Sequence, residues 1–410
     1  MLSNQLAPRM QRVQPSPTAV ISDKVRLLLA RGKPVINLGE GELHFDTPAH
    51  IKQAGIAAIE RGDTKYTAVA GTAELLKAIV DKFAHENGIR YSAQEVIAGT
   101  GAKQLIFNAL LATIAPDDEV LICAPYWVSY PDMVALAEGR VRVLPSTPET
   151  GWKLQPDVLR AAIGPRTRWL ILNSPNNPSG AVYTHDELKA LTDVLVEHEH
   201  VLLMADDIYE HVRYDERFYT PVQVEPRLRE RTLTVNGVSK GYSMTGWRIG
   251  YAGGPAWLIR AMQTLQSQST SNPSTISQAA AMAALRGGTA FMSDWLTALQ
   301  VNRQMVLATV ERCPGLHCAA SEGAFYAFVN CAGVIGASAP DGTVLSTDLD
   351  FANYLLDAAH VGVVHGSAFG VENHIRIAYA VPAQTLQEAC GRIEAACAAL
   401  VRSPVETSGR

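Results

Sequence analysis

One stretch of the sequence sets a lysine and an arginine among small residues. Residues 235–251 read VNGVSKGYSMTGWRIGY and contain Lys240 and Arg248. The run 231–235 before them is rich in β-branched residues and predicts a buried strand, so Lys240 is expected just past a strand end, where open α/β sheets bind ligands. Burial lowers the pKa of an ammonium group and makes a lysine suitable as a Schiff-base nucleophile or a general base. Lysine chemistry is therefore one hypothesis for this stretch.

The same stretch also fits a serine motif. Residues 237–241 read GVSKG and match the G-x-S-x-G turn that presents a serine nucleophile in α/β-hydrolases, with Ser239 as that nucleophile. The turn needs a helix directly after it, yet residues 242–250 contain two glycines and no amphipathic period. A solvated loop is the third interpretation. Because a short motif is only a hypothesis until its context agrees, the stretch alone leaves all three open.

Polar residues at other strand ends could converge on Lys240. Gly101 and Ala102 stand where a strand turns into a helix, and the free N–H groups and positive end of a helix form a phosphate cradle. No Walker A sequence occurs, which disfavours a nucleotide triphosphatase. Similar polar segments end other apolar runs, at residues 126–127, 173–180 and 205–209. The combination of these segments, rather than any single one, predicts a ligand site.

An acid ends one of these strands. Residues 201–206 read VLLMAD, and either Asp206 or Asp207 could be the buried acid, which would need a cationic partner. A pyridinium nitrogen is one such partner, because a neighbouring carboxylate raises the pKa of a base by roughly 1–3 units. Tyr209 could donate a hydrogen bond to a phenolate oxygen and Trp127 could cover a ring, although both aromatic residues also suit a core.

These residues need elements that bring them together, and the middle of the chain alternates short apolar runs with amphipathic segments. This alternation predicts an α/β fold with a mostly parallel, doubly wound sheet. Expected strands span 95–98, 119–124, 140–144, 167–172, 201–205 and 232–235; expected helices span 48–61, 72–87, 101–113 and 185–199. Thr184 and Glu187 form a capping box at the start of the last helix.

The two ends of the chain differ from the middle. Residues 289–312 and 385–400 have helical periodicity, and residues 323–329 and 374–379 alternate as half-buried strands would. We expect residues 1–14 to form an N-terminal arm, either disordered or laid on a partner subunit. Residues 48–304 would form a large domain, and residues 15–47 and 305–410 would together form a small α+β domain.

Composition bounds the functional class. The chain has 410 residues, 47% of them hydrophobic, and 35 basic against 40 acidic residues give a net charge of −5. This balance argues against nucleic-acid partners and anionic membrane surfaces. Six cysteines form no CxxC pair and no Cys/His spacing, so we expect no metal site, no disulfides and a cytoplasmic location. No apolar run is long enough to cross a bilayer.

Taken together, these segments resemble the class I pyridoxal-phosphate-dependent aminotransferases of fold type I, and most closely the bacterial-type aspartate aminotransferases. The resemblance extends from Val13 to about Leu400. It is carried by ordered segments at residues 100–104 (TGAKQ), 125–130 (PYWVSY), 173–180 (NSPNNPSG), 207–210 (DIYE), 236–251, 269–273 (STSNP) and 366–370 (GSAFG).

The resemblance implies a role for each candidate residue. Lys240 would form a Schiff base with pyridoxal 5′-phosphate and move the substrate proton, with Asp206 and Tyr209 as further catalytic residues. The cofactor would be held by Gly101, Ala102, Lys103, Trp127, Asn177, Asp206, Tyr209, Lys240, Arg248 and, from the neighbouring subunit of a homodimer, Tyr66. The substrate would be bound by Gly41, Lys103, Trp127, Asn177 and Arg376, the last gripping an α-carboxylate as a bidentate fork.

Departures from the family pattern concern the substrate. This chain has Leu43 and His44 within GELHF where the family shows GEPDF, and His365 where it often shows proline. A serine of some relatives is Gly237 here, and the distal-carboxylate arginine of animal-type enzymes is replaced by Ser267, which leaves Lys103 for that carboxylate.

The leading hypothesis is amino transfer between aspartate or glutamate and a 2-oxo acid such as 2-oxoglutarate. An aromatic or prephenate aminotransferase and a β-lyase are alternatives within the same fold. A serine hydrolase at Ser239, with His360, His365 or His374 as base, is the alternative from another class.

Overall fold

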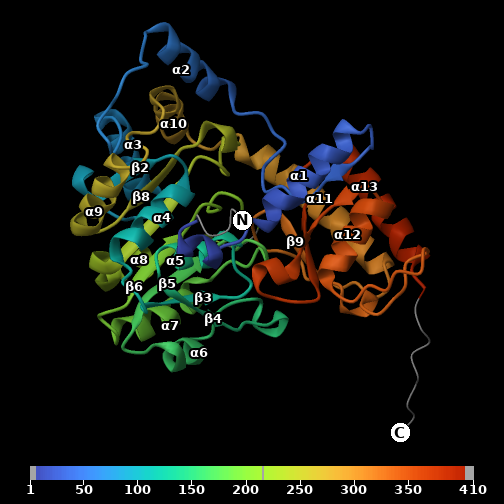
Figure 1. Cartoon of the computed structure of the whole chain (residues 1–410). Helices are drawn as coiled ribbons and strands as arrows, with labels where there is room; N and C mark the ends of the chain where they lie inside the picture. The colour runs from blue at the N-terminus through green and yellow to red at the C-terminus, as the bar shows by residue number, and fades with distance from the viewer. Residues whose placement is uncertain (1–5, 215–216, 402–410) are drawn as a thin grey trace.

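A seven-stranded sheet is the largest element of the computed structural model, which describes residues 6–214 and 217–401 (Figure 1). The strand order is β2-β8-β7-β6-β5-β3-β4. Every neighbouring pair is parallel except the two that involve β8, which confirms the predicted mostly parallel sheet. The strands are β2 (Val96–Gly99), β3 (Glu119–Cys123), β4 (Arg140–Leu144), β5 (Thr167–Asn173), β6 (Leu202–Asp206), β7 (Thr232–Gly237) and β8 (Gly250–Gly253).

Helices bury both faces of this sheet. Val120 and Ile122 of β3 pack with Leu105 of α4, whereas Leu121 between them packs with Leu188 of α7. Alternate residues of one strand thus enter two separate cores, which is the packing of a doubly wound α/β sheet. The helices of this region are α2 (Ala49–Glu60), α3 (Ala73–Glu86), α4 (Ala102–Thr113), α5 (Ser129–Leu136), α6 (Pro156–Ala162), α7 (His185–Val196), α8 (Pro221–Val224), α9 (Ala256–Ser267) and α10 (Thr275–Gly287).

The two chain ends meet in a second region, which we call the terminal region (residues 17–38 and 292–399). Strand β1 (Ile36–Asn37) pairs in parallel with β10 (Val361–Gly362), so α1 (Pro17–Ala30) lies beside the C-terminal helices (Figure 1). An antiparallel sheet has the order β11-β12-β9. The remaining elements are α11 (Met292–Arg312), β9 (Tyr326–Asn330), α12 (Asp348–Ala358), β11 (Val364–His365), β12 (His374–Ala378) and α13 (Ala383–Ala399). This arrangement matches the predicted α+β part.

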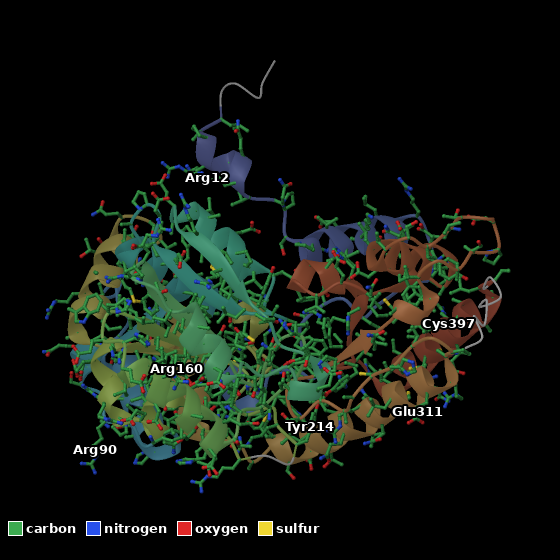
Figure 2. All side chains as sticks on the ribbon, turned by 90° about the horizontal axis from the view of Figure 1, so that it is seen from below. Arg12, Arg90, Arg160, Tyr214, Glu311 and Cys397 are labelled. Carbon is green, nitrogen blue, oxygen red and sulfur yellow. The ribbon has the colours of Figure 1, made fainter. Side chains whose placement is uncertain are left out.

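The exact domain boundaries stay a prediction. The helix α11 runs without a break through residue 305, where the sequence placed the boundary. Residues 8–12 of the predicted arm form a 3-10 helix, separated from α1 by an extended stretch (Figure 2), and Arg12 lies 3.5 Å from Glu138. Residues 1–5 of the arm and 402–410 of the predicted small domain lie outside the described residues.

Local sequence signals are confirmed where they act within one element. The capping box is present, because the Glu187 amide donates to the Thr184 hydroxyl and the Thr184 amide to the Glu187 carboxylate. The strand predicted over 323–329 starts only at Tyr326, since Gly323 and Ala324 donate instead to Gly180 and Val212 in other segments. Within the described residues, no helix combines the length and apolar character needed to cross a membrane.

Candidate active site

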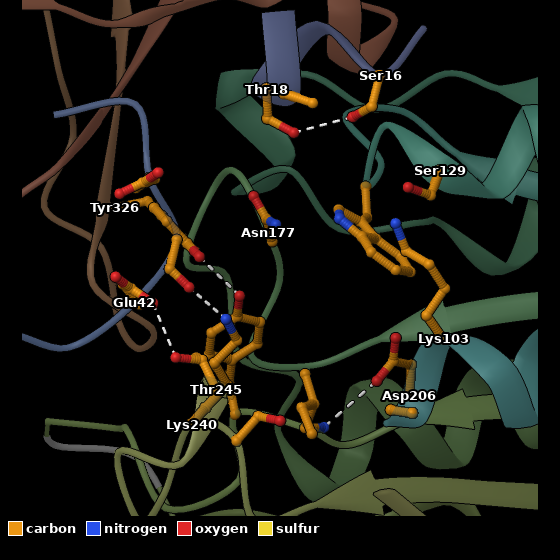
Figure 3. Close-up of a pocket in the computed structure, with 18 of the residues that line it drawn as sticks. Ser16, Thr18, Glu42, Lys103, Ser129, Asn177, Asp206, Lys240, Thr245 and Tyr326 are labelled. Carbon is orange, nitrogen blue, oxygen red and sulfur yellow. Dashed lines mark hydrogen bonds between the residues drawn. The ribbon is translucent and has the colours of Figure 1, made fainter. Parts of the chain in front are cut away.

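A cavity of about 440 Å³ lies at the carboxyl ends of the parallel strands, where the terminal region meets the large sheet (Figure 3). Its size is typical of small-molecule sites. The predicted site residues that line it are Gly41, Ala102, Lys103, Trp127, Asn177, Asp206, Tyr209, Lys240, Arg248 and Arg376. Polar groups that are more than a hundred residues apart in sequence therefore face one space, as the sequence predicted.

Lys240 follows β7, and its ammonium group donates to the Gly41 carbonyl oxygen (Figure 3). Burial lowers the pKa of Lys240 to about 8. The nearby charge of Glu42 opposes this shift, and the positive charges of Arg376 and Arg248 add to it. A lysine with this pKa has an appreciable neutral fraction near neutral pH, which a nucleophile or a general base needs.

Asp206 ends β6 and is only 4% exposed. Its carboxylate accepts hydrogen bonds from the Tyr130 hydroxyl (2.6 Å) and the Ile208 amide (3.4 Å), which are both neutral donors. Burial raises the pKa of Asp206 to about 6. Between the two acids that the sequence left open, Asp206 lines the cavity, whereas Asp207 is buried outside the set of lining residues.

One part of the cavity wall carries positive charge. Gly101 is the N-cap of α4 with φ +87°, and a Cβ there would lie 2.5 Å from Nη2 of Arg248. Arg248 itself has φ +57° and donates from Nη1 to the Thr245 carbonyl at 2.8 Å. Lys103 lies 4.8 Å from the centre of the Trp127 ring. A helix N-terminus with two cations is suited to a phosphate group.

Arg376 is 2% exposed and lies deep in the cavity wall. Its guanidinium donates to Oδ1 of Asn177 (2.9 Å) and to the Gly39 carbonyl (2.6 Å). Its Nε has no hydrogen-bond partner among the residues that the structure describes. Since these acceptors are neutral, the buried positive charge of Arg376 is well placed to attract an anionic ligand.

Sequence reasoning missed several lining residues. Tyr326 hydrogen-bonds the Tyr209 hydroxyl at 2.7 Å and lies under Arg376, whose Cζ is 4.5 Å from its ring centre. Tyr130 bonds Asp206, and Arg26 and Glu42 also line the cavity. Tyr130 falls within the segment PYWVSY that carries the family resemblance, so the sequence did contain a signal that could have identified it as a site residue. Tyr326 lies in an alternating strand that gave no sign of which face meets the site.

Tyr66 and the two unusual histidines do not reach this cavity. Tyr66 is 90% exposed and lines a separate surface cavity with Asn272 and Thr275. Nδ1 of His44 lies 3.1 Å from the Ala380 carbonyl oxygen, and Nδ1 of His365 lies 2.7 Å from the Ser367 hydroxyl. The departures from the family pattern at His44 and His365 therefore place no histidine among the described residues that line this cavity.

The hydrolase interpretation lacks its structural basis. Residues 238–244 form turns after β7, followed by the short 3-10 helix Thr245–Trp247, so Ser239 does not open the α-helix that a nucleophile elbow requires. The candidate bases His360, His365 and His374 are not among the described residues that line the cavity with Ser239.

A cluster with metal-ligand chemistry, which the sequence did not predict, lies elsewhere. Glu86, Glu210 and His211 could together offer ligand atoms to an ion. Lys82 already forms ion pairs with Glu210 and with Glu86, so a buried ammonium offsets part of the negative charge of this cluster.

Comparison with known proteins agrees with this site. Residues 33–393 match the family described as "Aminotransferase class I and II". The chain belongs to this family. It is a pyridoxal-phosphate-dependent aminotransferase, and the α/β fold of the structure is that of its relatives.

Similar proteins cover nearly the whole chain. A "Probable aspartate/prephenate aminotransferase" of Rhizobium leguminosarum bv. phaseoli is 52% identical over 96% of this chain and 99% of the relative. The crystal structure of the aspartate aminotransferase from Rhizobium meliloti is 51% identical, covers 97% of this chain and 99% of its own, and has a TM-score of 0.93. The Thermus thermophilus aspartate aminotransferase with maleate is 40% identical, with 95% and 99% covered and a TM-score of 0.89.

Proposed function

We propose that this aminotransferase exchanges the amino group of L-aspartate or L-glutamate with a 2-oxo acid such as 2-oxoglutarate. The observation that carries the proposal is that Lys103 and Arg376, two cations from distant segments, line one cavity with Lys240. Two cations can hold the two carboxylates of a dicarboxylic substrate. The relatives named for aspartate, and the one solved with maleate, support the same substrate class.

The donor set of the cavity fits pyridoxal phosphate. The N-terminus of α4 at Gly101 and Ala102, together with Arg248, would hold the phosphate. Asp206, whose direct donors are neutral, would gain a cationic partner in the ring nitrogen. Asn177 and Tyr209 would bind the ring oxygen, and Trp127 would cover the ring. When bound, the cofactor supplies an electron sink for the charge that develops at the substrate Cα.

The protein groups then perform binding and proton transfer. Arg376 would bind the α-carboxylate through its fork, with Gly41 and Asn177 next to it, and would orient the Cα–H bond. Lys240, with its pKa lowered to about 8, would accept and return the Cα proton.

We further propose a cytoplasmic homodimer with shared active sites. The support is Tyr66, an aromatic side chain that is 90% exposed in the single chain and has no part in its own cavity. In a dimer, this tyrosine would reach the phosphate in the site of the partner subunit. The six cysteines without CxxC spacing suit a reducing compartment.

Prephenate is a second candidate substrate. Relatives from Rhizobium leguminosarum and Cereibacter sphaeroides, each 52% identical, are named for both aspartate and prephenate. Prephenate also carries two carboxylates, which the same pair of cations could hold.

A half-reaction screen tests these proposals. Each amino acid is mixed with the loaded enzyme, and the visible spectrum of the cofactor is followed; aspartate and glutamate should convert it fastest, and 2-oxoglutarate should restore it. Prephenate should restore it as well if the second candidate is correct. A Lys240→Ala variant that retains turnover would refute the assignment of Lys240, and release of 2-oxo acid without an acceptor would indicate a β-lyase.

A further inference from the structure

The buried guanidinium of Arg376 contacts two aromatic rings. Its Cζ is 4.5 Å from the ring centre of Tyr326 and 5.0 Å from that of Phe369. All three side chains are at most 2% exposed. A cation over the face of an aromatic ring is attracted by the ring quadrupole, and more strongly where water is excluded. The two rings therefore stabilise a positive charge whose hydrogen-bond acceptors, Asn177 and Gly39, are neutral.

Tyr326 reaches Arg376 because of the strand register. In the antiparallel pair of β9 and β12, Arg376 is opposite Phe328. Tyr326 lies two residues before Phe328, so it points to the same face of the sheet and is a diagonal neighbour of the arginine. Tyr326 also lines the cavity (Figure 3). A Cβ on Gly41 would lie 2.5 Å from the Tyr326 hydroxyl oxygen, so this oxygen is packed against the loop that accepts the Lys240 hydrogen bond.

The Tyr326 hydroxyl also forms a hydrogen bond with Tyr209. The two hydroxyl oxygens are 2.7 Å apart, and burial raises the pKa of both groups, so both keep their protons at neutral pH. Only one of the two protons lies between the oxygens. When Tyr326 donates, the proton of Tyr209 is free for another acceptor, and the proposed acceptor is the ring oxygen of the cofactor. The Tyr326 hydroxyl thus determines the direction in which Tyr209 donates.

Phe369 is held beside Arg376 by its own loop. The amide and the hydroxyl of Ser367 donate to the two carboxylate oxygens of Asp348, each at 2.9 Å, and Asp348 is buried. Within the part of the chain that the structure describes, no ring contact joins Phe369 to Tyr209. Phe369 is therefore a contact of the arginine alone, whereas Tyr326 contacts both the arginine and the tyrosine.

We propose that Tyr326 and Phe369 are positioning residues for amino transfer, with divided roles. Both rings hold the guanidinium of Arg376 in the orientation that receives a carboxylate, and the Tyr326 hydroxyl directs the proton of Tyr209 toward the ring oxygen of the cofactor. Tyr326 thereby links the substrate-binding arginine to the cofactor-binding tyrosine. This inference rests on the proposed function.

Two measurements separate these roles. The dissociation constant of maleate, a dicarboxylate without an amino group, reports on Arg376 and is measured by calorimetry on the full chain with and without cofactor. The pH midpoint of the visible absorption of the loaded enzyme reports on the ring oxygen, and so on Tyr209. Phe351→Leu is the matched control, because Phe351 is as buried as Phe369 but is not one of the two rings beside Arg376.

Tyr326→Phe keeps the ring and removes the hydroxyl. It should leave the maleate dissociation constant within about twofold of the parent and raise the absorption midpoint by about one pH unit, because a weaker hydrogen bond leaves more negative charge on the ring oxygen. Phe369→Leu should weaken maleate binding by about tenfold, the effect of a buried cation–π contact, and leave the midpoint unchanged. Tyr326→Leu should change both quantities, and Phe351→Leu neither.

An unchanged midpoint in Tyr326→Phe would overturn the role of the hydroxyl. The role of the rings is wrong if Phe369→Leu binds maleate as the parent does, or if Phe351→Leu loses as much affinity. Phe369→Met, which fills a similar volume without a ring, decides this question if Phe369→Leu does not fold. If aspartate does not convert the cofactor of the parent enzyme, the proposed function fails instead, so the two failures are distinguishable.

Discussion

Asp206 is a buried acid whose direct hydrogen-bond donors, Tyr130 and Ile208, are neutral. Its pKa of about 6 lies above the usual value for aspartate, so the folded protein binds this proton more tightly than the unfolded chain does. The free energy of unfolding contributed by Asp206 therefore falls as the pH rises from about 4 to 6. Above that range the charged carboxylate destabilises the fold.

The variant Asp206→Asn should consequently be more stable than the parent without cofactor at pH 7, by on the order of 1–3 kcal/mol. The difference should vanish below about pH 4. Urea unfolding of both proteins at several pH values measures this difference. If the variant is destabilised equally at all pH values, the raised pKa of Asp206 in the folded protein is contradicted.

The same variant should lose activity, since a neutral amide lacks the negative charge that keeps the ring nitrogen protonated. If the carboxylate stabilises the protonated ring nitrogen by about two pKa units, its loss corresponds to a fall of roughly 100-fold in kcat. Steady-state kinetics with saturating cofactor checks this prediction, and the control is the circular dichroism spectrum, which should not change.

The proposed role of Arg376 in substrate binding can be tested by a substitution that keeps its positive charge. Arg376→Lys loses the planar fork and one of the contacts to Asn177 and Gly39, so kcat/KM for dicarboxylic substrates should fall by about 100-fold. Cofactor affinity should stay close to that of the parent, because these contacts are made away from the phosphate end. A parallel fall in cofactor affinity would show that Arg376 supports the cofactor rather than the substrate.

At the scale of elements, the N-terminus of α4 combines an unusual backbone with a close neighbour. In Gly101→Ala, the added Cβ is strained by the positive φ and also lies too close to Arg248. In Gly32→Ala, after α1, only the positive φ strains the backbone, because no atom lies within 4 Å of the added Cβ. Both variants should lose roughly 1 kcal/mol of stability. Only Gly101→Ala should also weaken cofactor binding, by about tenfold or more, in a fluorescence titration of the cofactor. Equal cofactor affinities would contradict the phosphate cradle.

Elements built from a local pattern could be predicted from the sequence, because a helix or a buried strand shows its period directly. Residues 322–324 could not, since their backbone amides donate to Gly180 and Val212, which lie far away in the chain. Tyr326 and Glu42 escaped prediction for the same reason: an alternating strand or a short loop does not reveal which distant side chain it will meet.

At the scale of the whole molecule, the proposed homodimer with shared active sites predicts complementation between two impaired variants. Lys240→Ala and Tyr66→Ala should each be impaired, but a mixed dimer contains one site with both residues intact. After unfolding together and refolding, about a quarter of the wild-type sites should be active. Activity no greater than the sum of the separate variants would show that Tyr66 serves its own subunit or none.

The sequence by itself indicated the family, predicted Lys240 just past a strand end and predicted most strands of the large sheet, because these depend on motifs and periods that lie within short segments. The tertiary structure decided which acid faces the cavity, that Arg376 is buried and that His44 and His365 are not among the described residues that line the cavity. It alone joined Glu42 to Thr245, which are about 200 residues apart. Contacts of this kind depend on how segments pack in three dimensions, and no local pattern encodes them.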